Sequence, residues 1–476
     1  MPQPIFLNGL NGSTGQALDD FQLTTEQLAK IAHQKRLSAE ELREAKLRRA
    51  QDQRNKNHFG VGEGVDIADL AQAGWGVIFP ASLPENQVAA LKEALSPLLD
   101  LRREQAGRLY FEFIGQERGY RAGESKNDFL KRFGRGAGAA NPESGVPFYL
   151  LIVGSPEEIP FSFQYQLDLQ YGVGRIHFDR LEYYAMYAQS VVQAEKGEIT
   201  RSKNVVFFGP SHDPATGFSS TSLVSPLAEK MTAKHPDWNV RLVEPAQATK
   251  SALSGLLGGA GTPALLFTAS HGLGFSLNDT RLLPQTGALL CQDFTGYTGG
   301  RISEQYYFSA DDIPSDADVA GTLAFFFACF GAGSPRADNF YRDMFGQEKV
   351  IAPYAFISRL PLKLLSHPRG GALGVYAHVD RAWGYSFLWG DDAAVADVET
   401  FRSMLSALMS GKPAGAATDY FGMRYGEIST ALTEELDSTT SEHQDEFKIA
   451  WWWTSNHDAR NYTFIGDPAV RLAVAK

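Results

Sequence analysis

Two short apolar runs constrain the fold of this chain more than any other feature. One run, residues 264–269, ends just before His271 and Gly272, and the other, residues 323–328, ends at Cys329. Runs of this length, rich in aliphatic and aromatic residues, are typical of strands buried on both faces of a parallel sheet. Because ligands bind at the carboxyl ends of such strands, a histidine and a cysteine would meet at one edge if the two strands are neighbours.

The same kind of pattern recurs along most of the chain. Further strands are predicted at residues 75–79, 148–153, 204–208, 240–243, 354–357 and 372–377. Helices are predicted at residues 24–57, 84–103, 182–195, 223–234, 251–257, 398–409 and 425–436. Strands that alternate with helices indicate an α/β fold in which a parallel sheet is covered on both faces.

A chain of 476 residues is too long for one core, so several packed units are expected. We predict a charged helical or extended segment at residues 1–60, a first α/β subdomain at residues 61–200 and a second at residues 201–476. The basic cluster at residues 46–54 suits either a solvated helix face or an interaction arm. The N-terminal segment is therefore a candidate latch or docking element for a regulatory protein partner.

Bulk composition excludes several classes of function. The net charge of −11 argues against nonspecific nucleic-acid binding, which needs a basic surface. No run of about 18 apolar residues is present, so no membrane span is expected. The first residues lack the basic and apolar regions of a secretory signal, so the expected location is the cytoplasm.

The chain has two cysteines, Cys291 and Cys329, which rules out a disulfide framework and a cysteine-rich metal site. No spacing of histidines and carboxylates indicates a transition metal, and we predict no metal and no cofactor. Calcium on loop carboxylates between residues 311 and 318 is conceivable, but no sequence feature supports it.

A histidine beside a cysteine can generate a thiolate nucleophile, because the imidazole accepts the thiol proton and its charged form stabilises the thiolate. The backbone N–H groups of Gly272 and Cys329 are candidate donors to the oxyanion of a tetrahedral intermediate. Each residue alone could have a purely structural role: a cysteine at the end of a strand is often a small buried hydrophobe, and His-Gly is often a turn. Because both apolar strands end in the same way at a reactive residue, a catalytic role is favoured.

The chain resembles the caspase-type cysteine peptidases, and within them the gingipain-like family. In that clan one apolar strand ends in His-Gly and the next in Ala-Cys. The resemblance covers about residues 70–476 and includes four further motifs. They are residues 149–160, 171–176, 371–383 and 462–470, the last similar to a Gly-Asp-Pro segment that ends many such domains.

This resemblance implies a three-layer αβα caspase-like fold with two α/β subdomains, and residues 201–476 as the catalytic one. It implies a cysteine endopeptidase acting on protein or peptide substrates, with Cys329 as nucleophile and His271 as base. The family's primary pocket maps to Gln164 and Asp168 on one side and Trp383 on the other. Asp168 would select a basic P1 side chain through a charge-assisted pair.

The residue that orients the histidine is left open by the sequence. The family often has an acidic residue near a Val-Gly turn, where this chain has Ser155 and Pro156 followed by Glu157 and Glu158. A Cys–His dyad with backbone support is therefore also possible. The adjacent Ser211, His212 and Asp213 cannot form a working triad by themselves, so a turn or substrate-loop role is expected there.

Two other histidines, His367 and His378, suit either a structural role or a place in the binding site, and Cys291 suits a structural role. Two further functions use the same features. A caspase-like scaffold would bind a partner without cleaving it, and a transpeptidase would pass the acyl-enzyme to an amine.

Overall fold

The computed structural model describes residues 9–16, 18, 64–136, 138–296, 300–342, 348–389, 395–438 and 446–475. Its centre is one ten-stranded sheet. In spatial order the strands are β3 (Tyr110–Phe113), β2 (Trp75–Ile78), β4 (Tyr149–Val153), β5 (Gly172–Ile176), β20 (Tyr462–Gly466), β17 (Gly374–His378), β12 (Leu323–Phe327), β8 (Leu265–Ala269), β6 (Asn204–Phe208) and β7 (Asn239–Val243). The helix predicted at residues 24–57 lies outside the described residues.

Within this sheet every neighbouring pair is parallel except β17 and β20. Two parallel halves therefore run in opposite directions and join at that pair. This is the mixed α/β fold with a mostly parallel sheet that the sequence predicts. The strands β8 and β12 are direct neighbours, and Ala269 pairs with Phe327 at their carboxyl ends.

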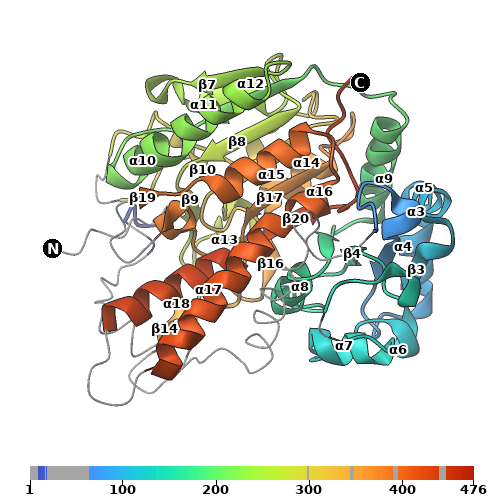
Figure 1. The fold of residues 1–476 in the computed structure, drawn as a ribbon. Coiled ribbons are helices and arrows are strands. Elements are labelled where there is room, and N and C mark those ends of the chain that lie inside the picture. The colour runs from blue at the N-terminus through green and yellow to red at the C-terminus, as the bar shows by residue number, and fades with distance from the viewer. Residues whose placement is uncertain are drawn as a thin grey trace.

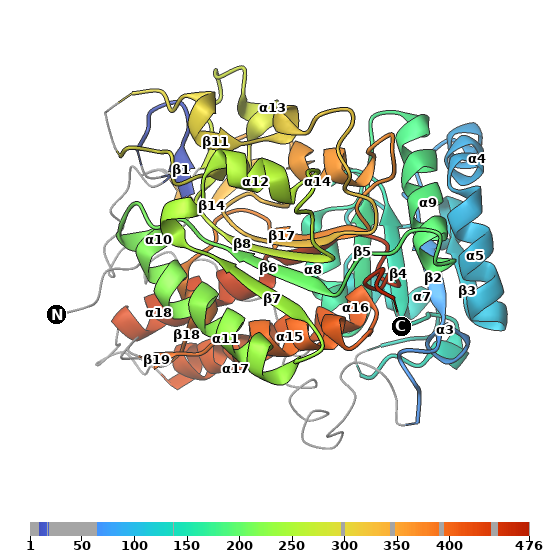
Figure 2. The same cartoon turned by 90° about the horizontal axis from the view of Figure 1, so that it is seen from above.

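Helices cover both faces of the sheet (Figure 1). In Figure 2 the helices α12, α13 and α14 lie on one side of β8 and β6, and α11, α15 and α17 lie on the other. Their bounds are α11 (Ser225–Lys234), α12 (Lys250–Leu256), α13 (Leu282–Gln285), α14 (Arg359–Leu365), α15 (Glu399–Met409) and α17 (Asp419–Ser438). Strands between two helix layers are buried on both faces, which explains their continuous apolar sequences.

Two predicted elements differ from the structure. The helix predicted at residues 84–103 is two helices, α4 (Glu85–Ala94) and α5 (Ser96–Ala106), because Pro97 begins a new helix in its first turn. The strand predicted at residues 354–357 is only β16 (Phe356–Ile357). It pairs with β13 (Gly333–Ser334) outside the main sheet, in the chain that leads away from Cys329.

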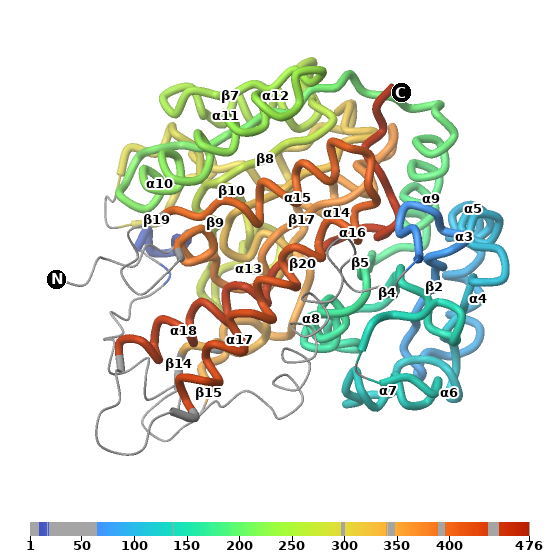
Figure 3. Tube along the Cα trace, in the orientation of Figure 1, coloured from blue at the N-terminus to red at the C-terminus, as the bar shows by residue number. Residues whose placement is uncertain are grey.

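The C-terminal segment is anchored within the first half of the sheet, to which β20 belongs. After β20 the carboxylate of Asp467 accepts hydrogen bonds from Trp75 Nε1 at 2.9 Å and from Arg102 Nε at 2.8 Å. Both partners belong to the first half, and the end of the chain lies beside α9 (Leu181–Glu195) in Figure 3. Burial lowers the pKa of Arg102, but the charges of Asp467 and Glu195 outweigh it, so the pKa is raised overall. The Gly-Asp-Pro motif thus has a structural role as a buried ion pair.

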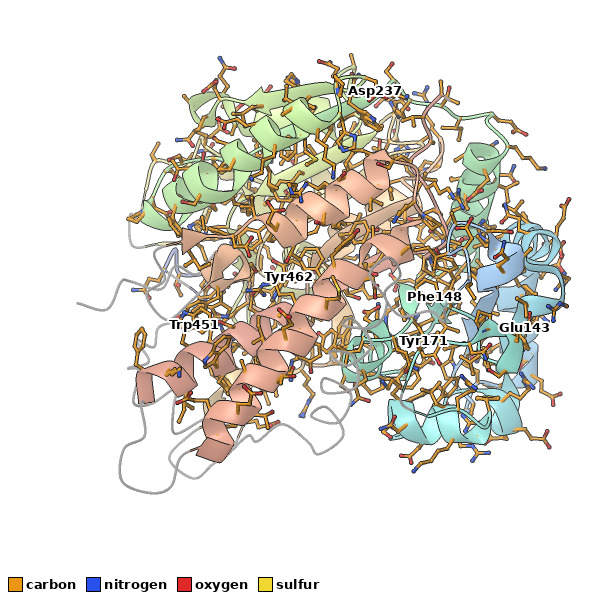
Figure 4. The ribbon with its side chains drawn as sticks, viewed as in Figure 1. Glu143, Phe148, Tyr171, Asp237, Trp451 and Tyr462 are labelled. Carbon is orange, nitrogen blue, oxygen red and sulfur yellow. The ribbon has the colours of Figure 1, made fainter. Side chains whose placement is uncertain are left out.

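Around the junction of the halves the core is largely aromatic. Figure 4 shows Tyr462 near the middle of the molecule, with Phe148 and Tyr171 on the side of the first half. Tyr462 packs against Phe421 with ring centroids 4.4 Å apart and is buried. The division into subdomains at residue 200 stays a prediction, since one sheet runs through both.

A second, small sheet lies at the far end of the molecule from α4 and α5. Its order is β1 (Gly9–Asn11), β9 (Gly272–Gly274), β10 (Leu289–Leu290) and β11 (Tyr307–Phe308). Figure 2 shows β1, in dark blue, beside elements of the second half although it comes first in the chain. Within the described parts of the chain, no helix has the length and apolar character needed to span a membrane.

Candidate active site

Four neighbouring strands of the main sheet each end at a residue of the candidate site. In sheet order, β6 leads to Asp213, β8 to His271, β12 to Cys329 and β17 to Ala382. These strands are mutually parallel, so their carboxyl ends lie at one edge of the sheet. This is the edge at which open α/β sheets bind ligands. The predicted neighbouring positions of the two strands are confirmed by the pairing of β8 with β12, so the strand ends that lead to His271 and Cys329 lie side by side.

His271 is held by a carboxylate that the sequence analysis had assigned to a turn. Its Nε2 lies 2.6 Å from Oδ2 of Asp213, and the imidazole is 1% exposed. Because a carboxylate only accepts hydrogen bonds, Nε2 carries the proton and Nδ1 of the neutral ring has the lone pair. Nδ1 is buried and has no hydrogen-bond partner among the described residues. The ring is therefore oriented with a proton acceptor left available.

Asp213 is positioned by the helix that follows it. It is the N-cap of α10 (Pro214–Ser219), where its Oδ1 accepts from the backbone N–H of Thr216 at 2.9 Å and from the Thr216 hydroxyl at 2.7 Å. Burial raises the pKa of the Asp213 carboxyl, but the hydrogen bonds from His271 and Thr216 outweigh it and lower the pKa far below its usual range. One oxygen thus caps a helix while the other orients the imidazole.

Sequence reasoning missed Asp213, although two signals were present. It follows an apolar strand by a few residues, and Asp-Pro-Ala-Thr is a helix-start signature with a cap and a residue that returns the hydrogen bond. What the sequence does not give is the sheet order, which sets β6 directly beside β8.

Cys329 lies in a fully buried position, 0% exposed. Its Sγ accepts a hydrogen bond from the backbone N–H of Ala382 at 3.2 Å. An N–H that points at sulfur stabilises the thiolate over the thiol. Ala382 was not singled out in the sequence, since a backbone donor has no signature of its own.

The backbone beside Cys329 is strained at two residues. Phe330 has φ of 58° and Asp380 has φ of 70°, and both are non-glycine residues in the left-handed region. The Phe330 N–H donates to the Asp380 carbonyl at 2.7 Å, so the two strained residues hold each other. Strain of this kind costs about 1–3 kcal/mol per residue and gathers at functional sites. Here it turns the chain sharply after the strand that presents the thiol.

Gly272 packs directly on the backbone of Cys329. A Cβ built on Gly272 would lie 1.8 Å from the Cys329 carbonyl oxygen, so no other residue fits there. The glycine is thus required by contact between the two strand ends themselves. The predicted oxyanion role of the Gly272 and Cys329 N–H groups stays a prediction.

The segment that carries Ala382 is fixed by buried ion pairs. Arg381 makes two hydrogen bonds to Asp338, at 2.9 and 2.7 Å. The Trp383 N–H donates to Asp458 Oδ1 at 2.9 Å, and Asp458 comes from α18 (Glu446–Arg460). This network holds in place the Ala382 N–H, which donates to Cys329 Sγ, and it also fixes the backbone of Trp383.

The predicted pocket residues are only partly brought together. Trp383 lies beside the site, 6% exposed, with its ring 5.3 Å from that of Phe340. Gln164 and Asp168 lie on α8 (Phe161–Asp168), where Gln164 Oε1 accepts from Arg175 at 2.9 Å. Asp168 lines a small internal cavity together with Tyr165, Phe325, Tyr376 and Arg460. Both side chains thus lie on a helix between β4 and β5, in the first half of the sheet.

The two glutamates after the Val-Gly turn have other partners. Glu158 Oε2 accepts from the backbone N–H of Ser155 at 2.9 Å, and Glu157 Oε1 accepts from Ala355 N–H at 2.8 Å. The position left open in the sequence, that of the acidic residue beside His271, is occupied by Asp213 instead.

One set of residues has the geometry of a metal site. The ligand atoms of His212, Asp213 and His271 lie within 4.8 Å of one another, the single such group found in the described part of the chain. Burial lowers the pKa of His212 to about 4, with the neighbouring His271 adding to the effect, so His212 is neutral at pH 7. An ion bound there would compete with the proton chemistry of His271.

The remaining candidates are structural. His378 Nε2 lies 2.9 Å from the Asp458 carbonyl and His367 Nε2 lies 3.0 Å from the Pro314 carbonyl. Cys291 is 0% exposed, and burial raises the pKa of its thiol. Two of the carboxylates considered for calcium pair with separate cations: Asp312 with Lys250 at 2.6 Å and Asp318 with Arg201 at 2.6 Å.

The chain is similar to known peptidases. The model of peptidase family C25 matches residues 77–473. Among solved structures, one described as a protease is 11% identical with a TM-score of 0.46, covering 84% of this chain and 78% of that chain. A complex of the pro- and mature domains of Porphyromonas gingivalis RgpB is 12% identical with a TM-score of 0.44, covering 84% and 80%. No curated protein matches. The chain belongs to peptidase family C25, the gingipain family of cysteine peptidases.

Proposed function

We propose that this chain is a cysteine endopeptidase in which Cys329 is the nucleophile, His271 the proton carrier and Asp213 the residue that orients His271. The observation that carries the proposal is that the three residues follow the carboxyl ends of three adjacent parallel strands, with His271 Nε2 2.6 Å from Asp213. A nucleophile, a base and a group that orients the base are the parts that acyl transfer requires.

In this mechanism Nδ1 of His271 accepts the proton of the Cys329 thiol, and the Ala382 N–H stabilises the thiolate. Sulfur attacks the peptide carbonyl carbon, and the oxyanion is stabilised by the N–H groups of Gly272 and Cys329. When the C–N bond breaks, the imidazolium gives its proton to the leaving amine and a thioester remains. Water, deprotonated by the imidazole, then attacks the thioester and releases the acid and the thiol.

The substrates in this proposal are proteins or peptides, cleaved in the cytoplasm. A preference for a basic P1 side chain stays a prediction, based on Asp168 and the family resemblance. Trp383 is the pocket residue that the geometry supports best, since it directly follows the Ala382 donor.

The test is a library of fluorogenic peptides varied at P1, with Cys329→Ala and His271→Ala as controls. We expect cleavage that both substitutions abolish. Equal turnover by Cys329→Ala would contradict the proposal. Mass spectrometry of the products separates hydrolysis from transfer to an amine, and partner binding without any cleavage would favour the scaffold function.

A further inference from the structure

The N-terminal residues of this chain lie on top of the candidate nucleophile. We call residues 9–16 and 18 the N-terminal cover. A Cβ built on Gly9 would lie 2.6 Å from Cys329 Sγ and 2.3 Å from Leu18 Cδ1. The Gly9 backbone is therefore in direct contact with the sulfur, and the Leu18 side chain packs against it.

The cover also occupies a strand edge beside the site. β1 pairs in parallel with β9, with Gly9 opposite Gly272 and Asn11 opposite Gly274. β10 pairs with the other edge of β9. An exposed edge next to a nucleophile is a place where an extended peptide adds as a strand, and here residues of the same chain already fill that edge.

The cover is held by a turn and one apolar anchor. The backbone hydrogen bonds Asn11 N–H to Gln16 O at 2.8 Å and Leu18 N–H to Gly9 O at 3.2 Å close the turn on itself. Leu10 is 0% exposed and belongs to a small apolar cluster with Leu273.

Polar contacts add a second anchor. The Gly12 carbonyl accepts from Arg281 Nη2 at 2.9 Å, and the Gly12 N–H donates to the Gly274 carbonyl at 2.7 Å. The Ser13 hydroxyl donates to Asp279, which in turn is paired with Arg281 at 2.8 Å. The strand pairing of the cover is with the small sheet and not with the ten-stranded sheet, so the cover can separate without breaking a strand pair of the main sheet.

We infer that the N-terminal cover is an internal occupant of the substrate groove, which must leave before a peptide can reach Cys329 and bind along the edge of β9. The reason is steric: attack needs a carbonyl carbon about 3–3.5 Å from sulfur, and the Gly9 backbone is in that place. This inference rests on the proposed function for its meaning, but the cover itself can be tested through the thiol alone.

The test compares the rates at which iodoacetamide alkylates Cys329 and Cys291, read by peptide mass mapping. Leu10→Ser removes the apolar anchor, and Gly9→Ala forces a methyl group against the sulfur. Gln16→Ala is the matched control, because the Gln16 side chain is exposed and only its backbone holds the turn. Cys291 is the internal control for unfolding, since it is buried in the main core.

We expect Cys329 to react about 10- to 100-fold faster in Leu10→Ser, the factor that corresponds to losing one buried leucine. Gly9→Ala should also react faster, while Gln16→Ala and the rate at Cys291 stay unchanged. A synthetic peptide with the sequence of residues 8–18, added to Leu10→Ser, should slow the reaction again. If Cys329 reacts equally fast in the parent and both variants, or if both cysteines accelerate together, the inference is overturned.

Peptide cleavage by the same variants separates this inference from the proposed function. Faster alkylation with no cleavage of any peptide would support the cover and refute the peptidase. Full cleavage by the parent chain, unchanged in Leu10→Ser and Gly9→Ala, would support the peptidase and refute the cover.

Discussion

Replacing Asp213 with asparagine tests whether the carboxylate beside His271 has a catalytic purpose or only caps a helix. The side chain has both tasks, one for each oxygen. Asparagine and serine are as good at the N-cap position as aspartate, so both Asp213→Asn and Asp213→Ser should preserve α10. Asparagine keeps an oxygen near Nε2 but loses the charge, and serine is too short to reach the ring.

The expected loss follows from the contact itself. A buried hydrogen bond to a charged group contributes about 1.5–3 kcal/mol. If the contact with Asp213 is needed to orient His271 and to stabilise the imidazolium in the transition state, kcat/KM falls by about 10- to 150-fold in Asp213→Asn. Asp213→Ser should lose at least as much, since it has no contact with His271.

The assay is kcat/KM on the best peptide from the P1 library, measured in the parent chain and in Leu10→Ser so that the cover does not limit the rate. Thr216→Val is the matched control, because it weakens the cap without touching His271. Thermal unfolding of each variant reports the cap separately. A value of kcat/KM within about threefold of the parent in Asp213→Asn, while Cys329→Ala is inactive, would show that the reasoning is wrong.

Three further predictions concern stability, pH and metal. Asp467→Asn should lower the free energy of unfolding in urea by about 3 kcal/mol, since it removes the fully buried one of the two carboxylates that pair with Arg102. Asp237→Asn, at an exposed ion pair, should cost under about 1 kcal/mol, and equal losses would contradict the buried network. The pKa of His212 is about 4 in the folded chain and about 6.5 in the unfolded chain. Because the unfolded chain then binds more protons, the free energy of unfolding should fall as the pH drops from about 7 to 4. Urea titrations at each pH should show a smaller fall in His212→Gln. Zinc at low concentration should bind the cluster of His212, Asp213 and His271 and inhibit peptide cleavage, and a chelator should restore the activity. If His212→Gln is inhibited as strongly as the parent chain, the cluster is not the zinc site.

Much of the fold follows from local patterns. The apolar runs at residues 264–269 and 323–328 appear as β8 and β12 in adjacent positions. Strands this apolar are stable when both faces are buried between layers of helices. The sequence therefore predicts both the strands and the edge of the sheet at which they end. Strands without such an apolar run gave no comparable signal. β3, with Glu112 among its four residues, and β5, with two glycines and Arg175 among its five, were not predicted as strands although both pair in the main sheet.

In the candidate site, too, local sequence patterns predict some features and tertiary packing decides the others. The sequence by itself determined that His271 and Cys329 end two buried strands, because hydrophobic pattern is a local property that survives without knowledge of the fold. Only the tertiary structure decided that Asp213 faces His271 and that Gly9 contacts the Cys329 thiol. Both contacts join residues far apart in sequence, through sheet order in one case and through pairing of a glycine-rich strand in the other. Which distant residues come into contact depends on the packing of the whole molecule, and a local sequence pattern does not predict it.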